Sequence, residues 1–385
     1  MFDPQTWAAV PFSFWSVVFF ALGCIVGSFL NVCIHRMPCG ESIVSPPSHC
    51  PHCNYAIPWY RNIPIFTWLL LRGKCSNCRA PISFRYFLVE LLTGVIFLST
   101  WVVHGDRSTS LVLAFCLLLS GFIVATFIDF EHFIIPDQIT LGGVAAGFLC
   151  SAAVPALHTD LFTGALPSTA LALRQSFLGI AVGGGLIYSI LRLGKLMFGR
   201  QKFNLEPNTK VVFTETTFRL PGEEIAYEDV FYRKSDVIIF EAKTIELIDR
   251  CYANVSVRLS PSLLRIGEDT FNPEEVFHME VVTDQIVIPR EAMGLGDVKF
   301  MAAIGAFLGW QAVIFSLMLS AVLGAFVGLA LVALKKQAWS SRLPYGPYIA
   351  VAATTWIFAG KPIVLWWFTV VNAWLVRWIE RLFPL

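Results

Sequence analysis

Charged residues are scarce in this sequence of 385 residues. Only 14% of the residues are Asp, Glu, Lys or Arg, while 56% are hydrophobic and the mean hydropathy is +0.65. A soluble domain normally carries about a quarter charged residues. The 28 basic and 27 acidic side chains leave a net charge of +1, so no global positive field would attract nucleic acid. The composition excludes an ordinary soluble domain and indicates a protein embedded in membrane lipid that binds no nucleic acid.

The sequence also lacks an internal repeat, a low-complexity segment and a nucleotide-binding fingerprint. Acidic residues are few outside one region, because 17 of the 27 lie between residues 199 and 291. In that region, stretches at 211–218, 237–241 and 281–288 alternate between apolar and polar residues, and turn signals such as Pro221-Gly222 separate them. We therefore expect residues 199–291 to form a small β-rich insert.

Apolar runs close to the roughly 20 residues that a helix needs to cross a bilayer dominate the rest. We expect eight or nine spans and an all-α polytopic membrane fold, with a cysteine-bearing loop and the β-rich insert in the cytoplasm. The first run lacks the basic start and cleavage site of a secretory signal, so we expect it to be retained. The runs are residues 12–34, 86–103, 111–128, 139–153, 177–193, 298–310, 312–333, 345–358 and 364–379, the last being either a span or an interfacial helix.

Basic residues gather in three connecting loops, which the positive-inside rule places in the cytoplasm. The predicted domains are a first span at 1–34, a cytoplasmic zinc-knuckle loop at 35–85, a helical core at 86–198, the insert at 199–291, and the rest of the core at 292–385. The basic residues are Arg36, Arg61, Arg72, Lys74, Arg79 and Arg85 after the first span, Arg192, Lys195, Arg200 and Lys202 after the fifth, and Lys335, Lys336 and Arg342 after the seventh.

Two cysteine pairs mark the first of these loops. Cys50 and Cys53 form one C-x-x-C pair, and Cys75 and Cys78 form a second pair after a further 21 residues. Both thiolates of such a pair reach one ion from a tight turn, and four sulfurs close the site against water, which is typical of structural zinc. The alternative, two disulfides, is disfavoured in a reducing compartment. Neighbouring histidines, His49 and His52, are substitute ligands in principle.

Five of the ten acids outside the insert lie at predicted cytoplasmic ends of spans: Glu90, Asp129, Glu131, Asp137 and Asp297. An ionisable group at membrane depth is a functional candidate because its desolvation is costly; the alternative is a solvated helix end. Asp129 opens the turn DFEHFIIPD. Asp297 closes a glycine-rich turn before an apolar segment of 13 residues, which is too short to span alone.

Two aspartates at one membrane face predict a carboxylate dyad, in which one ionised group activates water and one protonated group polarises a peptide carbonyl. Asp129 and Asp297 are 168 positions apart, so only folding can pair them. Gly294 and Gly296 would let another backbone approach. Asp137 is an alternative second acid. Glu90 either contacts substrate or forms an ion pair with Arg85.

Two other classes of protein compete with an enzyme. In a transporter or ion pathway, the same carboxylates would bind protons or cations. The cysteine pairs and the lack of paired broken helices count against it. In a noncatalytic scaffold, the cysteine loop and the insert would be docking surfaces, and mutation of the aspartates would cause no proteolytic loss.

Several segments together resemble the bacterial type IV prepilin peptidases, which are membrane aspartyl proteases of the GxGD type. The resemblance covers most of the predicted membrane part and leaves out the insert and the tail after Gly360. It is carried by GSFLNVCIHRMP (27–38), the two cysteine pairs joined by WYRNIPIFTWLLLRGKC, PISFRYFLVELLTG (81–94), IDFEHFIIPD (128–137), GLGDVKFMAAIGAFLGW (294–310) and LPYGPYIA (343–350).

The resemblance implies cleavage of the leader of type IV prepilins and type II secretion pseudopilins at the cytoplasmic face of the bacterial inner membrane. It assigns catalysis to Asp129 and Asp297. It also implies a second activity, methylation of the new amino terminus with S-adenosylmethionine, because the cysteine-bearing loop is associated with members that have it. An insert of about 90 residues before the GxGD segment departs from the family's usual short connection.

Overall fold

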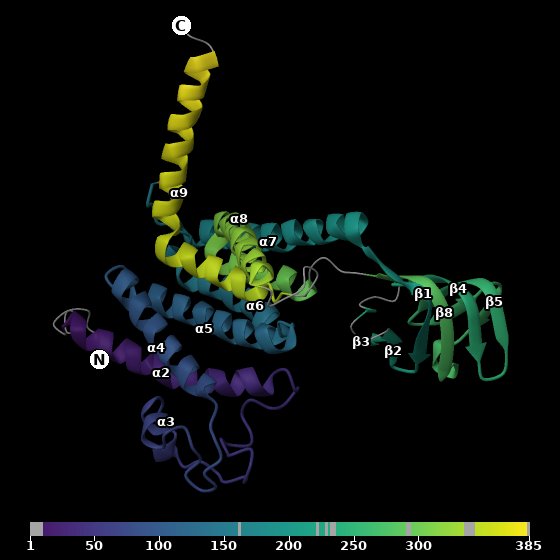
Figure 1. Cartoon of the computed structure of the whole chain (residues 1–385). Helices are drawn as coiled ribbons and strands as arrows, with labels where there is room; N and C mark the ends of the chain where they lie inside the picture. Colours follow the sequence, from purple (N-terminus) through teal and green to yellow (C-terminus); the bar gives the residue numbers. More distant parts are fainter. Residues whose placement is uncertain are drawn as a thin grey trace. The chain divides into compact units, whose positions relative to one another are not determined.

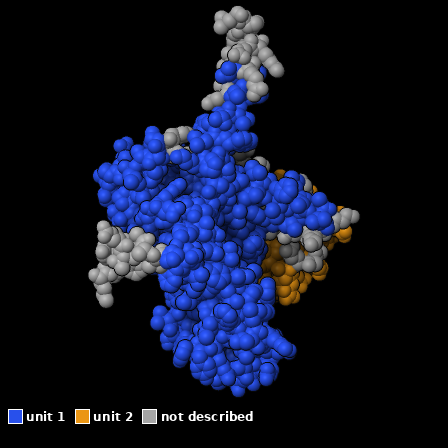
Figure 2. All heavy atoms as spheres, turned by 90° about the vertical axis from the view of Figure 1, so that its left-hand side faces the viewer, with its two compact units in different colours: residues 1–187, 295–385 blue, residues 188–294 orange. Residues whose placement is uncertain are grey.

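The computed structural model describes residues 11–160, 163–220, 223–227, 230–231, 236–289, 294–334 and 343–382. The chain forms two compact units, shown in different colours in Figure 2. The first comprises residues 1–187 and 295–385, and the second comprises residues 188–294. The predicted turn at Pro221-Gly222 and the basic residues Lys335, Lys336 and Arg342 lie outside the described residues.

Long apolar helices build the first unit (Figure 1), and six of the described helices are long and apolar enough to cross a membrane. The helices are α2 (Phe12–Arg36), α3 (Phe66–Leu70), α4 (Phe84–His104), α5 (Thr109–His132), α6 (Asp137–Ala153), α7 (Thr169–Phe198), α8 (Leu295–Ala333) and α9 (Gly346–Leu382), with short 3₁₀ turns η1 (Trp59–Arg61) and η2 (Pro155–His158).

Eight or nine spans were expected, whereas six of the described helices have the length and apolarity of a span. The runs at 298–310 and 312–333 are joined in α8, which is broken at Gly309, whereas the runs at 345–358 and 364–379 form one helix, α9, which continues through Pro362. In addition, α6 has 17 residues, which is at the lower limit of the lengths that cross a bilayer. Polar or small residues between two apolar runs do not by themselves end a helix.

The first half of α8 is the most enclosed element of the helical unit. Every residue from Phe300 to Gly309 is buried. Helices α6 and α7 approach it backbone to backbone, because a Cβ on Gly147 would lie 2.7 Å from the Ala306 side chain and a Cβ on Gly179 only 2.0 Å from the Gly305 carbonyl oxygen. Small residues on both sides therefore fix the position of α8.

Helix α8 breaks at Gly309, which has φ 79° and ψ 174°. A glycine adopts this left-handed conformation without the steric cost that a Cβ would bring. Next to the break, the Ala306 carbonyl oxygen accepts hydrogen bonds from the hydroxyls of Ser176 at 2.8 Å and Ser151 at 3.1 Å. The Ser151 hydroxyl also bonds to the His158 imidazole at 2.8 Å. Side chains from α6, η2 and α7 thus satisfy the broken helix.

Helices α2 and α4 pack against one another closely (Figure 1). A Cβ on Gly23 would lie 2.7 Å from the Thr93 carbonyl oxygen, so this approach requires glycine. One turn away along α2, the rings of Phe19 and Trp101 stack with centroids 4.7 Å apart.

The second unit is an eight-stranded antiparallel sheet in the order β3-β2-β1-β8-β4-β5-β6-β7. The label all-α for the whole chain is therefore wrong, although alternation had already pointed to strands in this region. In β4, for example, Ile238, Phe240 and Ala242 point into the core and alternate with less buried residues. The strands are β1 (Arg200–Thr214), β2 (Thr217–Leu220), β3 (Glu223–Ala226), β4 (Ile238–Leu247), β5 (Cys251–Ser260), β6 (Leu263–Ile266), β7 (Asp269–Phe271) and β8 (His278–Pro289).

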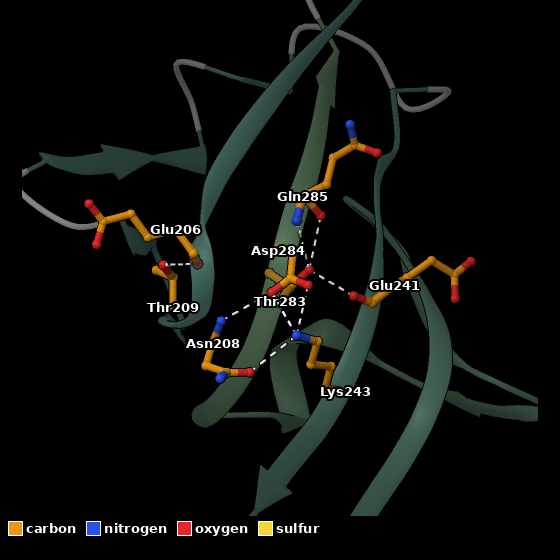
Figure 3. Close-up of polar contacts among 8 residues, drawn as sticks. All are labelled: Glu206, Asn208, Thr209, Glu241, Lys243, Thr283, Asp284 and Gln285. Carbon is orange, nitrogen blue, oxygen red and sulfur yellow. Dashed lines mark hydrogen bonds and ion pairs between the residues drawn. The ribbon is translucent and has the colours of Figure 1, made fainter.

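A polar cluster stabilises an irregularity in this sheet (Figure 3). The pairing of β1 with β8 shifts register between Asn204 and Thr209, and Asn208 there has a φ of 63°. Asp284 accepts a hydrogen bond from the Asn208 backbone N–H at 3.0 Å and pairs with Lys243 at 2.7 Å. Asp284 and Lys243 thus bond to each other and Asp284 also bonds to the irregular strand, so we read the cluster as structural.

Candidate active site

Asp129 lies in the last turn of α5, and its side chain is buried at 5% exposure. The chain turns away from the helix at Phe133, which has a left-handed φ of 54°. The Asp129 Oδ2 accepts a hydrogen bond of 2.8 Å from the backbone N–H of Gly346 at the start of α9. A backbone donor 217 positions away thus holds this carboxylate.

Asp297 lies in the first turn of α8, which begins at Leu295, and it is buried at 9% exposure. The free N–H groups and the dipole of a helix N-terminus favour a carboxylate at this place. Tyr345 lies within electrostatic range of Asp297. The Tyr345 hydroxyl is fixed in turn by a 2.9 Å hydrogen bond with Ser320 of the same helix, α8.

The two buried aspartates converge on one short segment, Tyr345 and Gly346. Asp129 bonds to Gly346, and Asp297 lies within electrostatic range of the adjacent Tyr345. Ile135, from the turn between α5 and α6, completes the group because its side chain lies 3.1 Å from a Cβ built on Gly346 and 3.4 Å from one built on Gly296. The structure therefore places both acids at the same end of the helical unit.

Asp137 and Gly294, the other predicted members of the site, lie at its edge. The Asp137 carboxylate is 59% exposed and forms an ion pair of 2.6 Å with Lys299, two residues after Asp297. This pair ties the start of α6 to the first turns of α8. Gly294 is exposed just before α8 begins, while Gly296 contacts Ile135 as described.

Glu90 lies apart from the two aspartates, in α4, and is buried at 8% exposure. Its Oε2 accepts a 2.7 Å hydrogen bond from the backbone N–H of Ile65 in the loop after α2. Arg85 forms its ion pair with Glu131 instead of Glu90. The Glu90–Arg85 pair considered from the sequence is therefore replaced by a contact with the backbone.

Sequence reasoning missed the contributions of Tyr345, Gly346 and Ile65. Two of the three partners use a backbone N–H, which any residue other than proline provides, so residue type alone carried no signal. The LPYGP segment was noted only for its resemblance to a family. The nearest available signal was the glycine within it, where a backbone can approach another group closely.

The four cysteines of the loop form a cluster with metal-ligand geometry. The sulfurs of Cys50, Cys53, Cys75 and Cys78 all lie within 4.8 Å of one another, and Cys50 and Cys78 are 3.8 Å apart. A tetrahedron with metal–sulfur bonds of about 2.3 Å has an edge of about 3.8 Å, so the cluster fits a metal ion. The Asn77 backbone N–H donates to the Cys75 sulfur at 3.4 Å, and a hydrogen bond of this kind favours the ligating thiolate.

The fold and the site define a polytopic membrane protein with two buried carboxylates at one end of its helices and a cluster of four cysteines that could hold a metal ion. The chain belongs to the type IV leader peptidase family. A profile described as type IV leader peptidase family matches residues 116–202 and 263–329, and one described as bacterial peptidase A24 N-terminal domain matches residues 21–104.

Two relatives carry the name prepilin leader peptidase/N-methyltransferase. The Aeromonas hydrophila protein is 28% identical over 94% of this chain and 96% of its own length. The Myxococcus xanthus protein is 41% identical over 48% of this chain and 57% of its own length. No solved structure matches the chain. The transporter alternative finds no support in these comparisons.

Proposed function

We propose that this protein is a prepilin leader peptidase and N-methyltransferase of the bacterial inner membrane, with its active site at the cytoplasmic face. The observation that supports the peptidase most strongly is the convergence of Asp129 and Asp297 on Tyr345 and Gly346. Buried carboxylates that share one site cannot both ionise easily, and aspartic proteases use this property. The relatives' names supply the substrate class, the leaders of prepilins and related pseudopilins.

In the proposed reaction, one aspartate of the pair is ionised and takes a proton from water, whose oxygen attacks the carbonyl carbon of the scissile peptide bond. The other aspartate is protonated and donates its proton to the carbonyl oxygen. Collapse of the tetrahedral intermediate breaks the C–N bond as the proton taken from water passes to the departing amine. One hydroxyl of the intermediate returns its proton to the second aspartate, which restores the starting state of the pair. Gly346 holds Asp129 in place through its backbone N–H during these steps.

The metal that we propose for the cysteine cluster is zinc, in a structural role. Four thiolates leave no coordination position for water or substrate, so such a site stabilises the fold and does not catalyse. The ion would hold together the residues around Cys50–Cys53 and Cys75–Cys78, which belong to no long helix or strand.

For the methyl donor, we propose a cavity of about 480 Å³ between α2 and the cysteine-bearing loop. Apolar side chains such as Phe29 and Ile63 line it together with Ser28, Asn62 and the buried Arg36. Apolar walls suit the adenine ring of S-adenosylmethionine, and a guanidinium suits its carboxylate. The bound donor would supply a methyl group to the amine released by cleavage.

The function is tested with the purified full-length protein in membranes, a prepilin peptide and S-adenosylmethionine, read by mass spectrometry. We expect loss of the leader and gain of one methyl group on the new amino terminus. An uncleaved peptide would contradict the peptidase. Cleavage without methyl transfer would contradict the second activity alone.

The donor cavity has its own binding test. Val32→Phe, which fills the cavity from α2, is expected to weaken binding of S-adenosylhomocysteine at least 10-fold by calorimetry while leaving peptide cleavage unchanged. Unaltered binding would place the donor elsewhere.

A further inference from the structure

An unusual patch of apolar side chains is exposed on the loop between α2 and α4. Trp59 is 83% exposed and Leu70 is 82% exposed, and the segment between them adds Tyr60, Ile63, Phe66 and Leu69, all at least 46% exposed. Contiguous apolar surface of this kind marks an interaction site. We call residues 59–72 the arm.

The arm has two different faces. In α3, Phe66, Leu69 and Leu70 are spaced so that they share one side of the helix, and this side is exposed. Trp68, on the other side, packs on the rings of Phe84 and Phe87 at the start of α4, with centroids 5.6 and 5.2 Å away. The arm is therefore seated on a membrane-spanning helix and turns its apolar face away from it.

The depth of the arm follows from its contact with Glu90. Ile65 donates its backbone N–H to the Glu90 carboxylate at 2.7 Å. Glu90 is six residues into α4, which is about 9 Å along the helix at 1.5 Å per residue. Ile65 has the left-handed φ of 63° that a β-branched residue rarely adopts, so the hydrogen bond holds a strained conformation. The arm thus runs beside the first turns of α4 instead of projecting from its end.

The charged residues around the arm indicate what kind of partner its apolar face contacts. Arg61 and Arg72 flank the apolar residues and are exposed, and Lys74 follows directly. Glu41 is the only acidic residue between residues 35 and 89 of the sequence. Exposed aromatic and aliphatic groups bordered by basic residues, at the depth of a helix end, match the boundary between acyl chains and anionic headgroups.

We propose that the arm inserts into the lipid leaflet at the N-terminal end of α4, with Phe66, Leu69 and Leu70 among the acyl chains and Arg61 and Arg72 at the headgroups. Cys75 follows Leu70 by only five residues. The inserted arm therefore holds the cysteine cluster against the membrane surface. This inference rests on the contacts of the arm with α4 and not on the catalytic proposal.

The test measures the surroundings of position 70 in the metal-loaded full-length protein in nanodiscs containing anionic lipid. A spin label is attached through an encoded non-natural amino acid, so that the ten native cysteines stay intact. Matched labels replace Leu117, 52% exposed on α5, and Ile248, an aliphatic residue 81% exposed in the sheet unit. The readout is relaxation by oxygen, which concentrates in lipid, against relaxation by a water-soluble nickel chelate.

We expect the label at position 70 to favour oxygen over nickel, as at position 117, and the label at position 248 to show the reverse. A label at position 70 that is accessible to nickel would overturn the proposal. So would one shielded from both reagents, which would show that a second copy or another protein covers the arm.

A second measurement guards against effects of the label. Leu69→Glu with Leu70→Glu is expected to lower the unfolding temperature more in anionic nanodiscs than in neutral detergent, since the two acids must enter a negatively charged leaflet. Ile248→Glu is expected to show no such difference. Equal behaviour of the two variants would contradict insertion.

Discussion

At the residue scale, the arrangement of the buried acids depends on the hydrogen bond that the backbone N–H of Gly346 donates. It donates to Asp129 Oδ2 at 2.8 Å, and a Cβ on Gly346 would itself lie 2.8 Å from the same oxygen. A side chain at this position would press on the carboxylate that the backbone holds. Glycine is therefore required there by a close approach.

Gly346→Ala is accordingly expected to lower the rate of leader cleavage by about 10-fold or more. A displaced hydrogen bond to a charged group is worth about 1.5–3 kcal/mol, and about 1.4 kcal/mol is a factor of ten in rate. The matched control is Gly324→Ala, where a Cβ would meet its nearest neighbour at an ordinary 3.5 Å. Equal rates for the two variants in a peptide assay would show that the Gly346 contact is dispensable.

His158, outside the membrane-spanning helices, carries a prediction about pH. Burial lowers its pKa from 6.5 to about 4. Between these values the unfolded state binds more protons than the folded state, so the free energy of unfolding falls as the pH is lowered through this window. The expected slope from this group is up to about 1.4 kcal/mol per pH unit.

The measurement is denaturant unfolding at about pH 7 and about pH 5, with His158→Asn for comparison. The variant is expected to be less stable at pH 7, since the bond to Ser151 changes, and to lose part of the pH dependence. An identical pH dependence in both proteins would show that His158 does not titrate as inferred.

The sequence predicted the residues with rare chemistry and missed those with ordinary chemistry. Asp129 and Asp297 stood out because acids are scarce in the apolar part of the chain, and the cysteines stood out by spacing. Their catalytic and metal-binding roles remain proposals. Gly346 and Ile65 act through backbone groups, and the pairing of Arg85 with Glu131 depends on how α4 and α5 are set beside one another. None of these has a local signature.

At the scale of elements, the first half of α8 carries Asp297 into the interior. Glycines in α7 make this possible: a Cβ on Gly183 would lie 2.4 Å from the Met301 carbonyl oxygen, and one on Gly179 would lie 2.0 Å from that of Gly305. Both distances are far below normal van der Waals contact. The sequence suggested that Gly183–Gly185 permits close packing, but only Gly183 of that run makes such an approach.

Gly179→Val is therefore expected to force α7 away from α8, with a loss of stability of about 2 kcal/mol or more. Gly185→Ala is the control, because a Cβ there meets nothing within 4 Å and alanine favours a helix. Thermal unfolding of both variants in detergent checks this. If Gly179→Val were as stable as Gly185→Ala, the close packing of α7 against α8 would be contradicted.

The break in α8 could not be located from the apolar runs alone. Apolar runs reveal which residues prefer lipid, but they do not reveal whether a helix continues between two runs. At Gly309 the backbone leaves the helical conformation, and the hydroxyls of Ser151 and Ser176, from α6 and α7, donate to the buried carbonyl of Ala306 next to the break. Those side chains lie more than a hundred residues away, which no local pattern records.

At the scale of the whole molecule, the chain combines a helical unit with a sheet whose two ends meet. Arg200 pairs with Pro289, so the start of β1 and the end of β8 lie side by side. This explains how about 90 residues are accommodated between α7 and α8. Alternation predicted strands but not their number or order, because pairing depends on contacts between distant segments.

Removal of the proposed metal ion tests whether that ion stabilises the cysteine-bearing loop. Cys50→Ser with Cys75→Ser is expected to abolish stoichiometric zinc and to lower the stability of the loop, because a structural ion contributes folding free energy. Elemental analysis and limited proteolysis of residues 37–83 measure both effects. A wild-type protein that is free of zinc yet resistant to proteolysis would contradict a structural metal.

The most direct test of the account is the rate of leader cleavage by Asp129→Asn and Asp297→Asn, with Asp137→Asn as the matched control. All three variants are compared as full-length protein in membranes after equal insertion and thermal stability have been verified. The account predicts loss of cleavage by at least a thousandfold in the first two variants and near wild-type rates in the third, whose carboxylate is exposed and paired with Lys299. Full activity in either buried-aspartate variant would contradict the proposed dyad.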